Sequence, residues 1–290
     1  MDLQLKEWLA KGHRFQHEGR SIFYRDEGTG PVLLCVHGYP TASWDWHRIW
    51  PLLAGRYRLV APDMLGFGFS DKPRDFGYSI AGQATLHENL LASLGIEEVH
   101  VLAHDYGDTV VQELMARHQE RLRSGAPGLR LRTVCLLNGG LFPETHRARP
   151  IQKLLRSPLA PLLLRLFNKR AFRRSFLPVF GAGTQPDDVE LARFWMLIEH
   201  NGGRANMGRL LHYMGERKRH RERWVGALAD ASIPLRLIVG MDDPVSGAHM
   251  VERYRELVPD ADVVELLGIG HYPQWEVPER VAEAVLGFAK

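Results

Sequence analysis

Short apolar runs alternate with longer amphipathic stretches through most of this chain. Val32–Val36 is a continuous apolar run, typical of a strand covered on both faces of a parallel sheet. Residues 43–53 and 79–94 have helical patterns, and Gly95 follows the second as a helix stop. Alternation of such strands with helices predicts the α/β class.

Eight short segments are predicted to be strands of one mostly parallel sheet flanked by helices. The first two are separated by the turn Glu18-Gly19. The segments are residues 14–17, 21–25, 32–36, 57–61, 99–103, 132–137, 235–239 and 263–267.

The alternation stops between about residues 143 and 224, where the chain is helical with polar interruptions. Within this part, residues 147–174 hold nine Lys or Arg and no Asp or Glu, mixed with several leucines. One interpretation is a surface that makes weak contact with an anionic membrane or steers an anionic partner. The other is a solvated basic face above an apolar face that packs on the rest of the protein.

Composition narrows the class of protein. The 290 residues are 45% hydrophobic, enough for one large α/β domain or two small ones. A net charge of +3, without interleaved basic and aromatic motifs, argues against a nucleic-acid partner. Residues 1–15 lack the apolar region of a signal peptide, and no run is long enough to span a membrane. We therefore expect a cytoplasmic protein whose two cysteines, Cys35 and Cys135, are reduced and buried; the oligomeric state is left open.

The most informative stretch runs from Val101 to Asp108. It has the pattern of a strand, a sharp turn and a helix start, with Asp105 between Ala103 and Gly107. The pattern small-x-acid-x-Gly matches the turn that exposes a catalytic nucleophile. A carboxylate there would attack a saturated carbon and form an alkyl ester that water must break. The alternative is an ordinary turn with Asp105 as the helix N-cap.

Two loops follow earlier strands. His37-Gly38-Tyr39-Pro40 comes directly after Val32–Val36, and alone it would indicate an ordinary turn. Residues 63–70 contain Gly66-x-Gly68, which is too short for the glycine fingerprint of a dinucleotide site. We expect neither a cofactor nor a metal ion.

Together these loops resemble the epoxide hydrolase and haloalkane dehalogenase branch of the α/β hydrolase fold. The resemblance rests on residues 37–40, 63–70 and 104–107. Over nearly the whole chain, the sequence also resembles the family of the mesoderm-specific transcript protein and its bacterial relatives, most clearly at residues 138–147 and 223–228.

The resemblance implies a hydrolase core in two parts and a helical cap inserted over the active site. The first part of the core would be residues 1–142, the cap residues 143–224, and the second part of the core residues 225–290.

It also implies a catalytic triad in the chain order nucleophile, acid, histidine. These roles fall to Asp105, Asp243 and His271. Asn138 ends a strand where some dehalogenases carry the acid, but an amide cannot ionise; Asp242 could substitute for Asp243. His271 would deprotonate the water that attacks the ester of the nucleophile.

Tyr39 and Tyr106 would supply the two backbone N–H groups of the oxyanion hole. Relatives with the same motif imply a cis Tyr39–Pro40 peptide bond. We expect four side chains to bind substrate: His37, Tyr39, His146 and Trp195.

Tyr213 falls where epoxide hydrolases carry one of two tyrosines that protonate the opening epoxide. A phenol suits this role because it stays protonated far above pH 7. It is the only tyrosine of the predicted cap, so the second donor would be missing or replaced by His146 or His200. Alternatively, Tyr213 is a packed aromatic of a cap helix.

The resulting prediction is a hydrolase that opens small apolar epoxides to diols with water. The first alternative is a haloalkane dehalogenase-like enzyme. Relatives of that kind hold the halide with a Trp directly after the nucleophile, where this chain has Tyr106, and Trp195 would partly compensate. Hydrolysis of esters or lactones, or a non-catalytic regulatory protein with the same fold, are the others.

Overall fold

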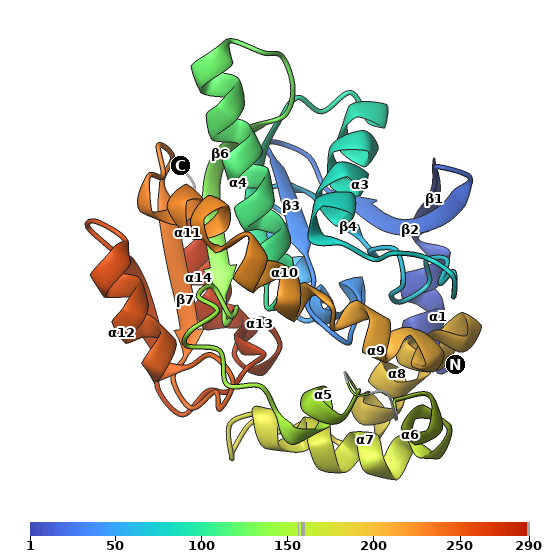
Figure 1. Cartoon of the computed structure of the whole chain (residues 1–290). Helices are drawn as coiled ribbons and strands as arrows, with labels where there is room; N and C mark the ends of the chain where they lie inside the picture. Colours follow the sequence, from blue (N-terminus) through green and yellow to red (C-terminus); the bar gives the residue numbers. More distant parts are fainter. Residues whose placement is uncertain (156, 158–159, 289–290) are drawn as a thin grey trace.

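An eight-stranded sheet forms the centre of the computed structural model, which describes residues 1–155, 157 and 160–288 (Figure 1). Its strand order is β1-β2-β4-β3-β5-β6-β7-β8. The pairs β1–β2 and β2–β4 are antiparallel and the rest are parallel, so the predicted mostly parallel sheet is confirmed. The strands are β1 Gly12–His17, β2 Arg20–Glu27, β3 Val32–Val36, β4 Arg58–Pro62, β5 Glu98–His104, β6 Arg130–Leu137, β7 Leu235–Gly240 and β8 Asp262–Leu266.

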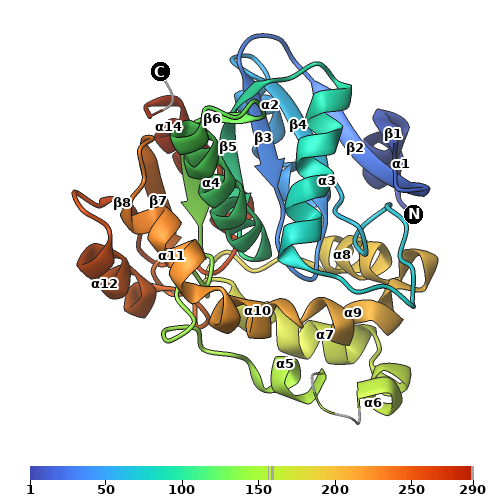
Figure 2. The same ribbon diagram turned by 45° about the horizontal axis from the view of Figure 1, so that its top comes forward.

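Helices cover both faces of the sheet. Figures 1 and 2 show α3, α4 and α11 on one face and α2 and α14 on the other. The helices of the core are α1 Leu3–Ala10, α2 Trp50–Leu53, α3 Ile80–Ser93, α4 Tyr106–Ser124, α11 Arg221–Ala229, α12 Ala248–Leu257, α13 Pro273–Glu276 and α14 Pro278–Leu286, with the 3-10 turn η1 Ser43–Trp46.

The remaining helices gather at one end of the sheet (Figure 1). They are α5 Pro150–Leu155, α6 Ala160–Leu166, α7 Lys169–Phe176, α8 Asp188–Glu199, α9 Met207–Leu210 and α10 Tyr213–Arg219, with the 3-10 turns η2 Leu177–Val179 and η3 His200–Asn206. This is the region predicted to be the cap. Its expected end at residue 224 falls inside α11, which packs against α4 of the core.

The helix predicted over residues 43–53 is wrong. The chain forms the short 3-10 turn η1, and only four residues of α helix follow it, with Pro51 in the first turn. Proline has no N–H to donate and favours a helix start, so a helix that ran through it would lose a hydrogen bond. The Asp45 carboxylate accepts instead from the Thr41 hydroxyl, which ties η1 back to the loop after β3.

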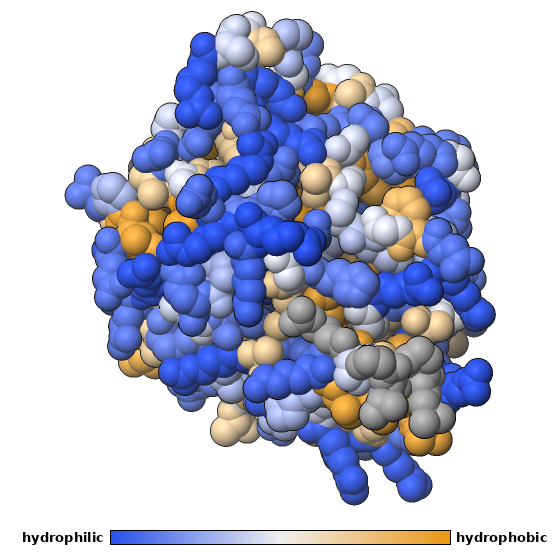
Figure 3. Space-filling view, viewed as in Figure 1, coloured by the Kyte–Doolittle hydropathy of each residue, from blue (hydrophilic) through white to orange (hydrophobic). Residues whose placement is uncertain are grey.

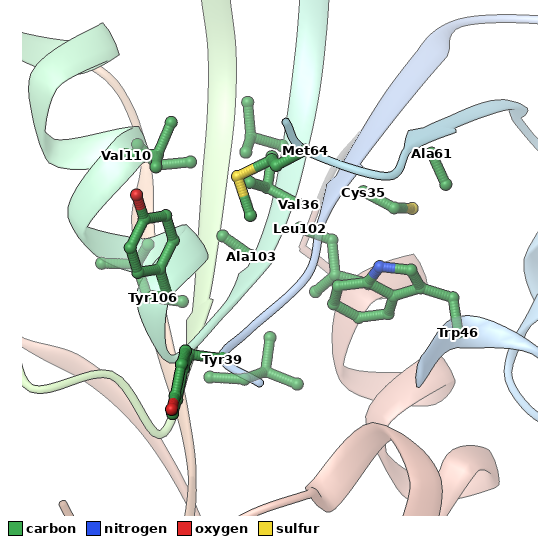
Figure 4. Packing of buried hydrophobic residues seen from close by; sticks show 14 of the residues in the cluster. Cys35, Val36, Tyr39, Trp46, Ala61, Met64, Leu102, Ala103, Tyr106 and Val110 are labelled. Atoms are coloured by element: carbon green, nitrogen blue, oxygen red, sulfur yellow. The ribbon is translucent and has the colours of Figure 1, made fainter. Parts of the chain in front are cut away.

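The core holds the strand ends in place. Cys35 and Val36 of β3 and Leu102 and Ala103 of β5 are almost wholly buried and pack side by side (Figure 4). Both cysteines are buried thiols, as expected. Among the described residues, no helix is both long and apolar enough to cross a membrane. In parallel sheets functional groups collect at the carboxyl ends of the strands, and both predicted loops lie at those ends.

Candidate active site

Asp105 lies at a strained turn between β5 and α4. Its φ of 49° and ψ of −107° are unusual for a residue with a side chain. Gly107 permits the turn, because a Cβ there would lie 2.3 Å from the Val36 carbonyl oxygen. The Asp105 side chain accepts no capping hydrogen bond from α4; only its backbone carbonyl does, from the Asp108 N–H at 3.2 Å. The alternative, in which the Asp105 carboxylate caps the helix, therefore does not describe this turn.

The loop after β3 supplies a donor to the Asp105 carboxylate. The Tyr39 N–H donates to Oδ2 of Asp105 over 3.1 Å. The Tyr39–Pro40 peptide bond is cis, as predicted. Tyr106 is the first residue of α4, where backbone N–H groups have no partner within the helix. The two predicted oxyanion-hole residues thus border the same carboxylate.

His271 lies between the two other residues of the predicted triad. Its Nδ1 is 2.7 Å from Oδ2 of Asp243, and its Nε2 is 3.7 Å from Oδ1 of Asp105. All three side chains are nearly inaccessible to solvent. Asp242, the alternative acid, is exposed and accepts only a long hydrogen bond from the Gly268 N–H, at 3.3 Å.

Several donors hold the Asp243 carboxylate in place. It accepts from the Val245 N–H at 2.7 Å, from the Ser246 hydroxyl at 2.9 Å and from the Asn138 side-chain amide at 2.9 Å. Asn138 therefore assists the acid from the strand end where some relatives carry the acid itself.

The charges around His271 favour its protonated form in the resting site. Burial lowers the pKa of His271, but the charge and hydrogen bond of Asp243 and the charge of Asp105 outweigh it and raise the pKa to about 9. Burial raises the pKa of Asp243, and the charge of His271 with the surrounding hydrogen bonds brings it below its usual value. The Asp243–His271 pair is thus ionised at neutral pH.

Two residues without a predicted role hold the histidine loop. The Glu276 carboxylate accepts from the N–H groups of Gly270 and Gly181 at 2.9 Å and of Tyr272 at 3.0 Å. His104 Nε2 donates to the His271 carbonyl oxygen over 2.7 Å. The His271 N–H donates in turn to the Val179 carbonyl at 2.8 Å, so the loop is fixed from both core and cap.

A narrow cavity of about 70 Å³ opens above the triad. Asp105 and His271 form part of its wall, and the rest is largely apolar and aromatic. Besides these two, its lining consists of Tyr39, Pro40, Arg149, Ile151, Gln152, Leu155, Phe167, Phe172, Ser175, Phe176, Val179, Met207, Val245 and Tyr272.

Of the four side chains predicted to bind substrate, Tyr39 alone belongs to this lining. Both ring nitrogens of His37 contact backbone groups, of Met64 at 3.0 Å and Gly38 at 2.9 Å, and the ring is fully buried. The His37 ring therefore holds the loop after β3 and is not part of the cavity lining.

The other two lie behind the wall. Trp195 packs on Phe167 and Phe172, with ring centroids 5.8 and 5.6 Å away, and these two rings face the cavity. His146 lies near Arg217, and burial together with this positive charge lowers the pKa of His146 to about 2. The protonated imidazole is thus disfavoured at this position.

Tyr213 is buried beside the ring of Tyr106, at a centroid distance of 4.8 Å, and Arg217 lies over its other side. It does not line the cavity. Tyr39 is a lining residue, and its hydroxyl donates to the carbonyl oxygen of Met207, another lining residue, over 3.3 Å. Figure 4 shows the Tyr39 and Tyr106 hydroxyls pointing in opposite directions. His200, the other suggested donor, packs edge-on against Phe69.

Comparison with known families agrees with this geometry. Residues 33–284 match the alpha/beta hydrolase family. The chain belongs to that family. It is 44% identical to the mesoderm-specific transcript protein of Mus musculus, over 98% of this chain and 87% of that protein, so the resemblance predicted from its motifs is confirmed.

Two solved structures show the same fold. A haloalkane dehalogenase DbeA loop variant from Bradyrhizobium elkanii has a TM-score of 0.78 at 24% identity, covering 96% of this chain and 95% of that one. The epoxide hydrolase CorEH has a TM-score of 0.74 at 21% identity, covering 96% and 97%. At these identities the likeness establishes the fold. It does not distinguish an epoxide from a haloalkane as substrate.

Proposed function

We propose that this hydrolase opens epoxides to diols through an ester of Asp105. The observation that carries the proposal is that Tyr39 lines the same cavity as Asp105 and His271, with its hydroxyl on the carbonyl oxygen of another lining residue, Met207. Opening an epoxide develops an alkoxide, which needs a proton donor nearby. Burial, with the neighbouring Tyr213 and Asp105, raises the pKa of Tyr39 well above its usual value, so the phenol keeps its proton.

The reaction has two steps. An Asp105 oxygen attacks an epoxide carbon, the C–O bond breaks, and the new oxyanion takes the Tyr39 proton, which leaves a hydroxyalkyl ester. His271 then removes a proton from water, and the water oxygen attacks the ester carbonyl carbon. The Tyr39 and Tyr106 N–H groups stabilise the tetrahedral oxyanion. Its collapse breaks the bond to the alkyl oxygen, which takes the proton of the new Asp105 carboxylic acid and leaves as the diol. The proton that His271 loses when Asp105 is esterified returns the Tyr39 phenolate to its phenol form.

We expect Tyr39→Phe to slow ring opening by about 10²-fold, the usual scale for loss of a general acid. Tyr213→Phe, the change suggested by sequence alone, should act less, because Tyr213 lies outside the cavity lining. The measurement is the pre-steady-state rate of Asp105 alkylation by styrene oxide in both variants. A large effect at Tyr213 with none at Tyr39 would return the acid role to Tyr213.

The two steps should also differ in pH dependence. Esterification removes the Asp105 charge, one of the groups that raise the pKa of His271 to about 9. The pKa of His271 therefore falls in the intermediate, and ester hydrolysis should increase with pH through a midpoint below 9 and then level off. Single-turnover hydrolysis rates across this range measure the midpoint. A midpoint no lower than the pKa of His271 measured in the free protein by NMR titration would mean that Asp105 does not act on His271 as described.

Halide displacement is the alternative, favoured by 28% identity to haloalkane dehalogenase 2 of Mycobacterium tuberculosis over 91% of this chain. It needs N–H donors around the leaving ion, and no indole is among the described residues of the cavity wall. The deciding experiment uses His271→Gln, which should allow the ester to form but not to be hydrolysed. Intact mass spectrometry after exposure to an epoxide should show the mass of the whole epoxide added to the protein.

A haloalkane panel is the matched control for that experiment. Halide displacement would add the alkyl group without its halogen, so the two reactions give different masses. An adduct from haloalkanes with none from any epoxide would overturn the epoxide assignment. Absence of any adduct would contradict the Asp105 mechanism itself.

A further inference from the structure

The active-site cavity shares a wall with a basic groove on the cap surface. Arg149, Ile151 and Ser175 border both the cavity and the groove, whose volume is about 630 Å³. Arg170 and Arg174 of α7 line the far side of the groove. The groove that carries the exposed guanidinium groups of Arg170 and Arg174 therefore adjoins the cavity that holds Asp105.

Helix α7 presents apolar side chains on one face and charged side chains on the other. Phe172 and Phe176 are buried and face the cavity, while Arg170 and Arg174, also four residues apart, are exposed on the other face. Residues at this spacing are neighbours on a helix, and two like charges there repel each other. Figure 3 shows long hydrophilic side chains projecting where Figure 1 has α7.

The side chains of the three groove arginines are not neutralised by an acidic partner among the described residues. Within the described part of the chain, Arg149, Arg170 and Arg174 form no ion pair, whereas Arg173 pairs with Asp188 at 3.2 Å. The Arg149 N–H is held by the Gln152 side chain at 2.9 Å, at the start of α5, which fixes the backbone at the junction of cavity and groove.

We propose that the substrate is an anionic amphiphile. Its carboxylate or phosphate binds the three arginines of the groove, and its slender apolar part enters the cavity and brings the reactive carbon to Asp105. Guanidinium groups suit this role because their paired N–H donors match the oxygens of both anions. The reaction at the apolar end rests on the proposed function. The binding of the anionic end rests on the arginines of the groove alone.

Binding without reaction tests the anion site. Decanoate, decyl phosphate and the neutral 1-decanol are titrated calorimetrically into wild-type protein, below the concentration at which they form micelles. We expect both anions to bind about tenfold or more tightly than the alcohol, the scale of a charge-assisted contact. The combined change Arg149→Gln, Arg170→Gln and Arg174→Gln should remove the difference in affinity between the anions and the alcohol.

Arg173→Gln is the matched control, because it removes the same charge from the same helix but lies outside the groove lining. It should keep the preference for anions. Equal binding of all three ligands to wild type, or an anion preference that survives the triple change, would overturn the proposal. The proposal would also be overturned if the wild type bound decanoate, decyl phosphate and 1-decanol equally but bound phosphatidylserine-containing vesicles through these arginines. The surface would then bind a membrane.

A turnover measurement separates this inference from the proposed function. The wild type is given 10,11-epoxyundecanoate and its neutral amide. We expect a KM about tenfold lower for the acid, and no difference after the triple change. Anion-selective binding without turnover of either epoxide would refute the epoxide chemistry alone. Turnover of both with equal KM and equal ligand binding would refute the anion site alone.

Discussion

Replacing Asp105 with Ala is expected to abolish turnover and, in the His271→Gln background, to abolish the trapped adduct. The carboxylate is the only group at the strained turn that can form the ester, and Tyr39 N–H already points at it. Loss of a nucleophile costs about 10⁴-fold or more in rate. Steady-state diol formation and intact mass measure the two effects.

Asp242→Asn is a matched control, because it removes a carboxylate from an exposed position outside the triad. It should retain turnover and the thermal unfolding midpoint of the wild type. An Asp105→Ala protein that keeps near wild-type activity would show that another group attacks the substrate.

Asp243→Asn is expected to lower the rate of ester hydrolysis by about 10⁴-fold, as the equivalent change does in a serine protease. An amide would offer a donor to His271 and favour the wrong imidazole tautomer. The effect should fall on hydrolysis more than on alkylation, so the ester should accumulate. Rapid-quench mass spectrometry distinguishes the two steps.

The neighbouring Asp242→Asn again serves for comparison. Its side chain accepts one long hydrogen bond and does not reach His271, so little change is expected. If the two variants showed the reverse pattern, the acid of the triad would be Asp242, contrary to the 2.7 Å contact between Asp243 and His271.

Much of the fold could be predicted because its signals are local. The run Val32–Val36 is apolar throughout because the strand is buried on nearly all sides, and β3 has the same bounds. The helix expected at residues 43–53 does not form as one element, because Pro51 favours a helix start and the hydrogen bond between Thr41 and Asp45 holds the preceding residues in a 3-10 turn. Such ties join residues of a loop and leave little trace in periodicity.

The proximity of Asp105, Asp243 and His271 could be predicted because each lies in a loop with its own motif. The sequence could not predict which tyrosine side chain points toward the cavity. Tyr213 and Tyr39 are both tyrosines near the site, and the packing of Tyr213 on Tyr106 and Arg217 decides which one borders the cavity. The groove was visible in the sequence only as a basic stretch, because its junction with the cavity depends on how α5 and α7 meet.

The Glu276 carboxylate binds the histidine loop and the cap residue Gly181 at the same time. One carboxylate thus joins the loop that carries His271 to the region predicted to be the cap, so the position of the imidazole depends on contacts from both parts of the chain.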